Sequence, residues 1–308
     1  MLYSDSKSSE KIDGPPPRQH TRKTIQGTPK TLCLPQLCKL GGISSVLVVR
    51  QQSPWTKYRP ALTCDIAGKV IIATHRSNPS RLQAVREYSK IDAESLIQRF
   101  GCLYHANILS SRDCYMDSTS MYAFVDDLPL TLGNLVSSLC IYPTEVELAA
   151  IMSQVRHLVS FLADNLTDKV LNGLCYLGSF GLSHRSLSCR EILLGMNGEI
   201  KIACLDHCVK CTPIESQTGY LNALAGITMA LMQKYEKNAG IIGVDDLSRW
   251  PVDSDAVGFL SAVSTGSIES LRKHPLVAAR YRPTDDLVML ARAVLGAGVV
   301  TYTSEVAP

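Results

Sequence analysis

The sequence contains no long hydrophobic run, and its N-terminus lacks the apolar core of a secretory signal peptide. A membrane-spanning helix needs roughly 18 or more consecutive apolar residues. The apolar segment at residues 221–232 is too short, and Arg292 interrupts the one near the C-terminus. Residues 1–10 are mostly polar, which does not fit a signal peptide. We therefore expect no membrane partner and a cytoplasmic or nuclear location.

The chain also has little net charge and few aromatic residues. The formal net charge is +3, and aromatic residues make up 6% of 308 residues, so no overall field favours a nucleic-acid partner. Cysteine is not scarce, with 11 residues. An odd number in a long chain without a signal peptide indicates reduced, mostly buried thiols. Hydrophobic residues reach 45%, which is enough to form a sizeable core.

Composition divides the chain into a leader, a domain and a tail. Residues 1–42 are basic and rich in proline, and the run at residues 14–18 cannot pack as a helix or strand. We expect this leader to be disordered. Residues 43–278 carry the apolar patterns of a folded domain, and residues 279–308 are expected to form a C-terminal tail with a helix at 285–296 and a loose end.

The first part of the domain is predicted to be a small sheet with one helix. Runs of β-branched and apolar residues predict strands at residues 45–50, 60–64, 69–74 and 121–125, the first three of them antiparallel. An apolar stripe predicts a helix over residues 81–100.

The second part of the domain is predicted to be mainly helical. Helices are expected at residues 143–155 and 221–232. Thr144 and Glu147 have the spacing of a capping box at the start of the helix at 143–155.

A polar loop followed by a hairpin lies at residues 181–203. His184, Arg185 and Ser186 form the loop, where a scaffold would present chemical groups. Asn197 and Gly198 favour a tight two-residue turn. The residues after this turn alternate polar and apolar, as a half-buried strand does.

This stretch resembles the catalytic loop of eukaryotic-type protein kinases, in which H-R-D-L-x-x-x-N precedes a hairpin and a D-F-G triplet. His184, Arg185 and Leu187 match this pattern. Ser186 stands at the position of the catalytic Asp, and Glu191 stands at the position of the metal-binding Asn.

Further segments are similar to other kinase motifs, in the order of the family. Residues 103–109 resemble the H-P-N-I segment, residues 204–206 occupy the D-F-G position, and residues 267–276 resemble the element that closes the helical lobe. The resemblance covers roughly residues 45–278. It implies an α+β, two-lobed protein kinase-like fold with a reduced N-terminal sheet and a helical C-terminal lobe, divided near residues 126 and 127.

Several groups that the family uses for phosphoryl transfer are substituted. No G-x-G-x-x-G is present, and no A-P-E triplet follows the D-F-G position. On the best register Thr74 replaces the lysine of the third kinase strand, and a shifted register would offer His75 or Arg76. The acidic partner of that lysine would be Glu94, with Glu87 as the alternative.

The resemblance implies ATP and Mg²⁺ as cofactors, and the missing motifs argue against both. The implied nucleotide site comprises Thr74, Asp126, Leu193 and Cys204. Glu191 and Asp206 are the candidate Mg²⁺ ligands, because a carboxylate can bind Mg²⁺ where an amide did. A surface residue at the start of the hairpin is the favoured interpretation of Glu191, ahead of a Mg²⁺ ligand. Ser186 has no carboxylate to accept a proton, so no intact catalytic loop is expected.

A cysteine-rich segment follows the hairpin and offers atoms that could bind zinc. The candidate zinc ligands are Cys189, Cys204, His207, Cys208 and Cys211. Their spacing matches no strong zinc pattern, so reduced thiols are the simpler interpretation.

Residues 156–170 interrupt what would be one continuous helix in a kinase. Either a true insertion or an unspliced intron would explain them. Three functions therefore stay open: a pseudokinase that acts as a regulatory or scaffolding module for a protein partner, a divergent ATP-dependent Ser/Thr kinase, and a non-functional or mis-spliced kinase-like product.

Overall fold

The computed structural model describes residues 47–103, 106–159, 182–237, 241–266, 270–271, 273–278 and 283–304. All of them belong to the unit that spans Leu37–Pro308. The predicted leader at residues 1–42 and the greater part of the segment at 156–170 lie outside the described residues.

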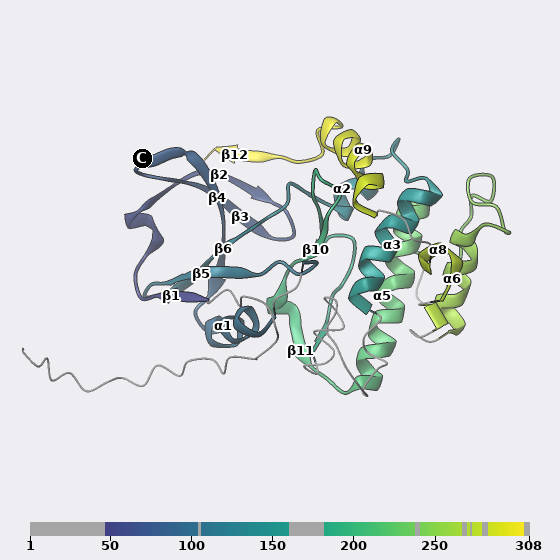
Figure 1. Ribbon diagram of the computed structural model, residues 1–308, viewed down its shortest axis with the longest axis horizontal. Helices are drawn as coiled ribbons and strands as arrows, with labels where there is room; N and C mark the ends of the chain where they lie inside the picture. Colours follow the sequence, from purple (N-terminus) through teal and green to yellow (C-terminus); the bar gives the residue numbers. More distant parts are fainter. Residues whose placement is uncertain are drawn as a thin grey trace, which may run out of the picture. The chain divides into compact units, whose positions relative to one another are not determined.

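The N-terminal part of this unit is a seven-stranded sheet in the order β1-β5-β6-β4-β3-β2-β12 (Figure 1). Its strands are β1 (Val48–Arg50), β2 (Tyr58–Asp65), β3 (Lys69–His75), β4 (Asn78–Ser89), β5 (Ser111–Met116), β6 (Ser120–Val125) and β12 (Tyr302–Ser304). The sheet is therefore larger than the reduced sheet that the sequence predicts. The first strand also differs from the prediction, because β1 lies at an edge and pairs parallel with β5.

The predicted helix at residues 81–100 is wrong in its first half. Residues as far as Ser89 continue β4, and helix α1 spans only Ala93–Cys102. β4 pairs with β3 at one edge and with β6 at the other, and each face of this sheet packs against an apolar cluster. Val85 and Tyr88 pack on opposite faces of the strand, and their three-residue spacing imitates a helical stripe.

The C-terminal part is mainly helical. Its helices are α2 (Leu132–Ser137), α3 (Glu145–Val159), α5 (Pro213–Gln233), α6 (Asp255–Thr265), α8 (Pro275–Ala278) and α9 (Pro283–Gly296). α3 and α5 pack side by side in this part (Figure 1). Two small sheets complete it, formed by β7 (Leu130–Thr131), β9 (Ile192–Leu194) and β10 (Ile200–Ile202), and by β8 (Leu182–His184) and β11 (Cys208–Lys210).

The capping box predicted for α3 is confirmed. The backbone N–H of Thr144 donates to Glu147 Oε2 at 2.7 Å, and the N–H of Glu147 donates to Thr144 Oγ1 at 3.2 Å. α3 then continues to Val159, a few residues into the segment that the sequence marks as an insertion.

α5 begins earlier than the sequence predicts. Thr212 caps it through a second capping box with Glu215, and Pro213 occupies its first turn. Only residues 207–212 therefore separate Asp206 from α5. This leaves room for the short strand β11 and for no longer segment.

Residues 283–304 pack onto the rest of the unit rather than forming a loose tail. Leu287, Leu290, Ala291 and Val294 of α9 are buried, and α9 packs against α3. β12 then pairs antiparallel with β2 at the edge of the large sheet. None of the helices in the described ranges is long and apolar enough to cross a membrane.

Candidate functional site

The buried side chain of His184 anchors the loop that follows β8. Its side chain is 5% exposed, and Nε2 lies 3.2 Å from the carbonyl oxygen of Ala203. Burial lowers the pKa of His184, so the buried imidazole is favoured in its neutral form. The neighbouring Arg185 side chain is exposed, and Ser186 Oγ lies 3.0 Å from Nδ1 of His207.

Glu191 closes the turn that precedes β9. Its Oε2 accepts hydrogen bonds from the backbone N–H of Ser188 at 2.9 Å and from the Ser188 hydroxyl at 2.7 Å. This geometry uses the carboxylate as a local turn acceptor, which is the simpler of the two predicted roles.

Cys204 stands where the family places the metal-binding Asp. It adopts a left-handed backbone with φ of 56°, and its Sγ donates to the carbonyl of Ala67 at 3.2 Å. Burial raises the pKa of this thiol to about 12. A protonated thiol is a poor ligand for Mg²⁺, which prefers oxygen.

A cleft of about 540 Å³ lies between the large sheet and the helical part. Its lining includes Asp65, Gly68, Arg86, Asn134, Glu191, Cys204, Asp206 and His207. The structure thus brings together Glu191, Cys204 and Asp206 of the predicted site.

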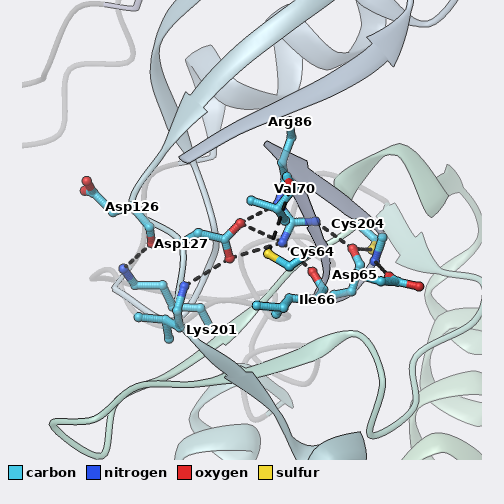
Figure 2. A network of polar contacts seen from close by, with 12 residues as sticks. Cys64, Asp65, Ile66, Val70, Arg86, Asp126, Asp127, Lys201 and Cys204 are labelled. Carbon is cyan, nitrogen blue, oxygen red and sulfur yellow. Dashed lines mark hydrogen bonds and ion pairs between the residues drawn. The ribbon is translucent and has the colours of Figure 1, made fainter. Parts of the chain in front are cut away.

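Three other predicted residues do not line this cleft. Thr74 lies on β3 opposite Arg59 and Leu82. Leu193 is fully buried in the core. Asp126 accepts a hydrogen bond through its backbone carbonyl from Lys201 at 3.3 Å (Figure 2), and it lines a different hollow.

Arg86 lies on β4, the strand before α1, and its cationic side chain lines the cleft. Its guanidinium forms a bidentate ion pair with the Asp127 carboxylate, with hydrogen bonds of 2.9 and 3.1 Å (Figure 2). It also donates to the backbone carbonyls of Ala67 at 2.6 Å and Ile66 at 2.7 Å. The two side chains of the pair are only 4% and 6% exposed. Arg86 therefore joins the β2–β3 turn to the segment that connects the two parts.

The environment of Asp127 is set by burial and by Arg86. Burial raises the pKa of the Asp127 carboxyl, and the Arg86 charge opposes this shift. An ion pair this deeply buried has little stabilising value of its own, whereas loss of one partner leaves an uncompensated charge. Each member therefore holds the other in place.

The sequence does not indicate Arg86 as a cleft residue, because the apolar spacing over residues 81–89 predicts a helix. With β4 as the strand before α1, Ala84-Val85-Arg86 fits the V-A-I-K pattern, with arginine in place of lysine. The same register places Gly68 and Val70 at the end of the glycine-loop pattern. The signal in the sequence was therefore present, but the helical spacing concealed it.

The predicted acidic partners of the strand cation lie elsewhere. Glu94 is exposed in the first turn of α1, while the inward-facing residue of that helix is the fully buried Leu96. Glu87 accepts hydrogen bonds from Ser120 at 2.9 Å and Tyr122 at 3.2 Å. Arg86 thus pairs with Asp127 instead of an acid on α1.

The candidate zinc ligands do not come together in one cluster. Within the described part of the chain, no three His, Cys, Asp or Glu side chains come together in a way that could hold one. Cys189 and Cys208 are buried, and burial raises the pKa of both thiols. The thiols of Cys189 and Cys208 are therefore favoured in their protonated form.

Comparisons with known proteins agree with this architecture. No protein-family model matches the chain. Over 126 residues, 40% of the chain, it is 32% identical to cyclin-dependent kinase 12 of Caenorhabditis elegans. Over 131 residues, 39% of the chain, it is 30% identical to mitogen-activated protein kinase kinase kinase 1 of Arabidopsis thaliana. These matches cover 16% and 19% of the two relatives, so the chain spans less than a fifth of either.

The fold is also similar to a solved kinase structure. The twitchin kinase region from C. elegans superposes with a TM-score of 0.58 at 14% sequence identity, covering 85% of this chain and 55% of that chain. At this identity the likeness concerns the fold alone. Together with the kinase relatives it supports a protein kinase-like family, and the described chain has a mixed α and β, protein kinase-like fold.

Proposed function

We propose that this chain is a pseudokinase module, which keeps a kinase-like fold and acts through contacts with a protein partner rather than by efficient phosphoryl transfer. The observation that carries the proposal is the Arg86–Asp127 pair, because it ties the cleft-facing cation to the chain itself. In an active kinase the corresponding lysine is free to pair with the α/β-phosphates and with an acid on the following helix.

Two further substitutions support the proposal. Ser186 offers no base for a substrate hydroxyl, and its own hydroxyl lies against His207. The six residues between Asp206 and α5 are too few for an activation segment. The cleft, the position of the catalytic base and the activation segment therefore all differ from those of an active kinase.

The test is nucleotide binding by the whole chain. A ligand that binds only the folded state raises the melting temperature, by an amount that corresponds to about 2.7 kcal/mol at 100 times Kd. We expect no shift with millimolar Mg-ATP, and no transfer of labelled phosphate to the chain or to a generic protein substrate. A saturable shift together with phosphate transfer would overturn the proposal.

The alternative function is a divergent ATP-dependent Ser/Thr kinase. It is favoured by the names of the relatives and by the carboxylates of Asp65, Glu191 and Asp206 around the cleft. If Mg-ATP does raise the melting temperature, a Glu191→Gln variant discriminates further. It keeps the acceptor for Ser188 but removes the charge, so loss of only the Mg²⁺-dependent part of the shift would favour this alternative. A non-functional product is tested separately, by sequencing the transcript across the codons for residues 156–170.

A further inference from the structure

A serine, a histidine and an aspartate lie together beside the cleft. Ser186 Oγ is 3.0 Å from Nδ1 of His207, and Nε2 of His207 is 3.6 Å from Oδ2 of Asp206. All three residues are exposed, and His207 and Asp206 line the cleft. A hydroxyl next to an imidazole, which in turn lies near a carboxylate, is the arrangement by which proteins activate serine as a nucleophile.

Main-chain pairing brings these side chains together. β8 and β11 pair antiparallel, so Ser186, which follows β8, and His207, which precedes β11, lie at the same end of the ladder. The backbone N–H of Arg185 donates to the carbonyl of His207 at 3.2 Å. From the other side, Arg99 of α1 donates to the carbonyl of Leu205 at 2.6 Å. These bonds fix the spacing between the two loops that carry the hydroxyl and the imidazole.

The three side chains have complementary roles in proton transfer. The carboxylate of Asp206 favours the His207 tautomer with its proton on Nε2, because this places the N–H beside a negative charge. Nδ1 is then the acceptor next to the Ser186 hydroxyl. The 3.6 Å between Nε2 and Oδ2 exceeds hydrogen-bond length, so Asp206 acts on the imidazole as a nearby charge.

We propose that Ser186 is a nucleophile for acyl transfer, with His207 as its general base and Asp206 as the charge that orients the imidazole. Oγ of Ser186 bonds to the carbonyl carbon of an ester while its proton passes to Nδ1 of His207. The bond to the leaving group then breaks, and the departing group takes that proton. Water attacks the acyl-serine with His207 again as base, which releases the carboxylic acid and restores the Ser186 hydroxyl.

The chemistry of the site indicates the class of substrate. An exposed site supplies base catalysis but lacks the water-free surroundings that strengthen electrostatic stabilisation of a transition state. Base catalysis alone suits esters with a good leaving group, such as a phenol or a thiol. The cleft of about 540 Å³ beside His207 has room for a small ester of this kind. This activity goes beyond the proposed function, since it involves no phosphoryl group.

The test is hydrolysis of p-nitrophenyl acetate by the full chain. We expect saturable release of p-nitrophenol and an acetyl group on Ser186, located by mass spectrometry of the digested protein. Ser186→Ala should abolish this acetylation, and Ser186→Ala and His207→Gln should each lower kcat/KM by about a hundredfold. Asp206→Asn should lower kcat about tenfold with KM unchanged, and Asp206→Glu should keep most of the wild-type kcat.

The matched control is a second serine–histidine contact, located on the large sheet. Ser77 Oγ lies 2.7 Å from Nδ1 of His75, but in the described ranges the ring of His75 packs on Tyr58 and forms no ion pair with a carboxylate. Ser77→Ala should keep kcat/KM within about twofold of wild type, because this contact lacks the third, orienting group. Ser186, His207 and Ser77 are all exposed, so their variants should keep the wild-type melting temperature.

Several outcomes would overturn this proposal. Release of p-nitrophenol that does not saturate, or acetyl groups on lysines alone, would assign the reaction to ordinary surface groups. Wild-type kcat/KM in Ser186→Ala or His207→Gln, or an equal loss in Ser77→Ala, would also do so. The Mg-ATP experiment does not depend on the Ser186 hydroxyl, so the two proposals can fail separately.

Discussion

At the scale of single residues, Arg86 and Asp127 form the contact with the largest consequences for the cleft. One carboxylate and two backbone carbonyls accept four hydrogen bonds from the guanidinium of Arg86, and a side chain with five N–H donors then has only one left for a phosphate. The same side chain therefore lines the cleft and connects segments of the fold.

The first prediction concerns this ion pair. Asp127→Leu should lower the free energy of unfolding by about 3–5 kcal/mol, because it leaves a buried guanidinium unpaired. The double variant Arg86→Met with Asp127→Leu should recover most of that loss. Urea unfolding of the two single variants and the double variant measures the coupling.

The control for this prediction is the exposed pair formed by Arg249 and Asp246. Their side chains are 41% and 50% exposed and 3.6 Å apart, so Asp246→Asn should cost less than about 1 kcal/mol. Equal losses of unfolding free energy for Asp127→Leu and Asp246→Asn would contradict this account of the buried pair.

The second prediction concerns pH and two histidines, the buried His184 and the partly buried His274. Burial lowers the pKa of both His184 and His274 below the ordinary value near 6.5. The unfolded chain therefore binds more protons than the folded chain just below pH 6.5, and stability falls as the pH drops from there through the folded-state pKa values.

The measurement is the free energy of unfolding between pH 7.5 and 5. His184→Gln should make this dependence shallower, because it removes one titrating group, whatever its effect on absolute stability. His274→Gln removes the other group with a lowered pKa and should also make the dependence shallower. An unchanged slope in His184→Gln would contradict the assignment.

At the scale of elements, the hairpin of β9 and β10 illustrates how local and tertiary requirements coincide. Asn197 and Gly198 predict the turn from sequence alone, and the structure has Gly198 at φ of 78°. The same glycine touches α9, since a Cβ there would lie 1.8 Å from the carbonyl oxygen of Thr284. Gln154 of α3 also binds this hairpin, donating to the Gly198 carbonyl at 2.9 Å and accepting from the Ile200 N–H at 3.1 Å.

The third prediction separates these two requirements. Gly298 also has a positive φ, 68°, but a Cβ there would meet nothing within 4 Å. Gly298→Ala should cost about 1–2 kcal/mol from backbone strain alone. Gly198→Ala should cost about 1–3 kcal/mol more, because the hairpin or α9 must move. Similar losses in chemical denaturation would mean that the contact with Thr284 is easily relieved.

Elements also show where sequence patterns succeed and where they fail. The capping box of α3 is a local device, since Thr144 and Glu147 satisfy each other, and it was predictable. β4 was mistaken for a helix because both of its faces are covered by other parts of the chain. As a result, the predicted register places Thr74 instead of Arg86 at the position of the kinase lysine.

At the scale of the whole described unit, the C-terminal residues join its two parts. α9 packs on α3 in the helical part, and β12 extends the sheet beside β2. Residues 283–304 are therefore part of the domain and contribute to its core.

The fourth prediction is made at this scale. Removal of residues 283–308 should lower the free energy of unfolding by at least about 4 kcal/mol, since four apolar side chains of α9 leave the core. Removal of residues 301–308 takes away β12, leaves α9, Val299 and Val300 in place, and should cost much less. Urea unfolding and the yield of soluble protein compare the two truncations, and equal stability of the longer truncation and the full chain would contradict this account.

The sequence alone determined the class of fold, the order of its motifs and the substituted loop at His184, Arg185, Ser186 and Glu191. The class of fold followed from the resemblance of these motifs to those of protein kinases, and the motifs themselves consist of residues adjacent along the chain. The tertiary structure decided which side chains meet in the cleft. Arg86 and Asp127 are 41 positions apart in the chain, and no local pattern records that a strand directs one of them toward the other. The apolar cluster that includes Tyr115, Tyr122 and Phe124 likewise depends on side chains from several strands, because packing across a sheet is set by register rather than by neighbours in sequence.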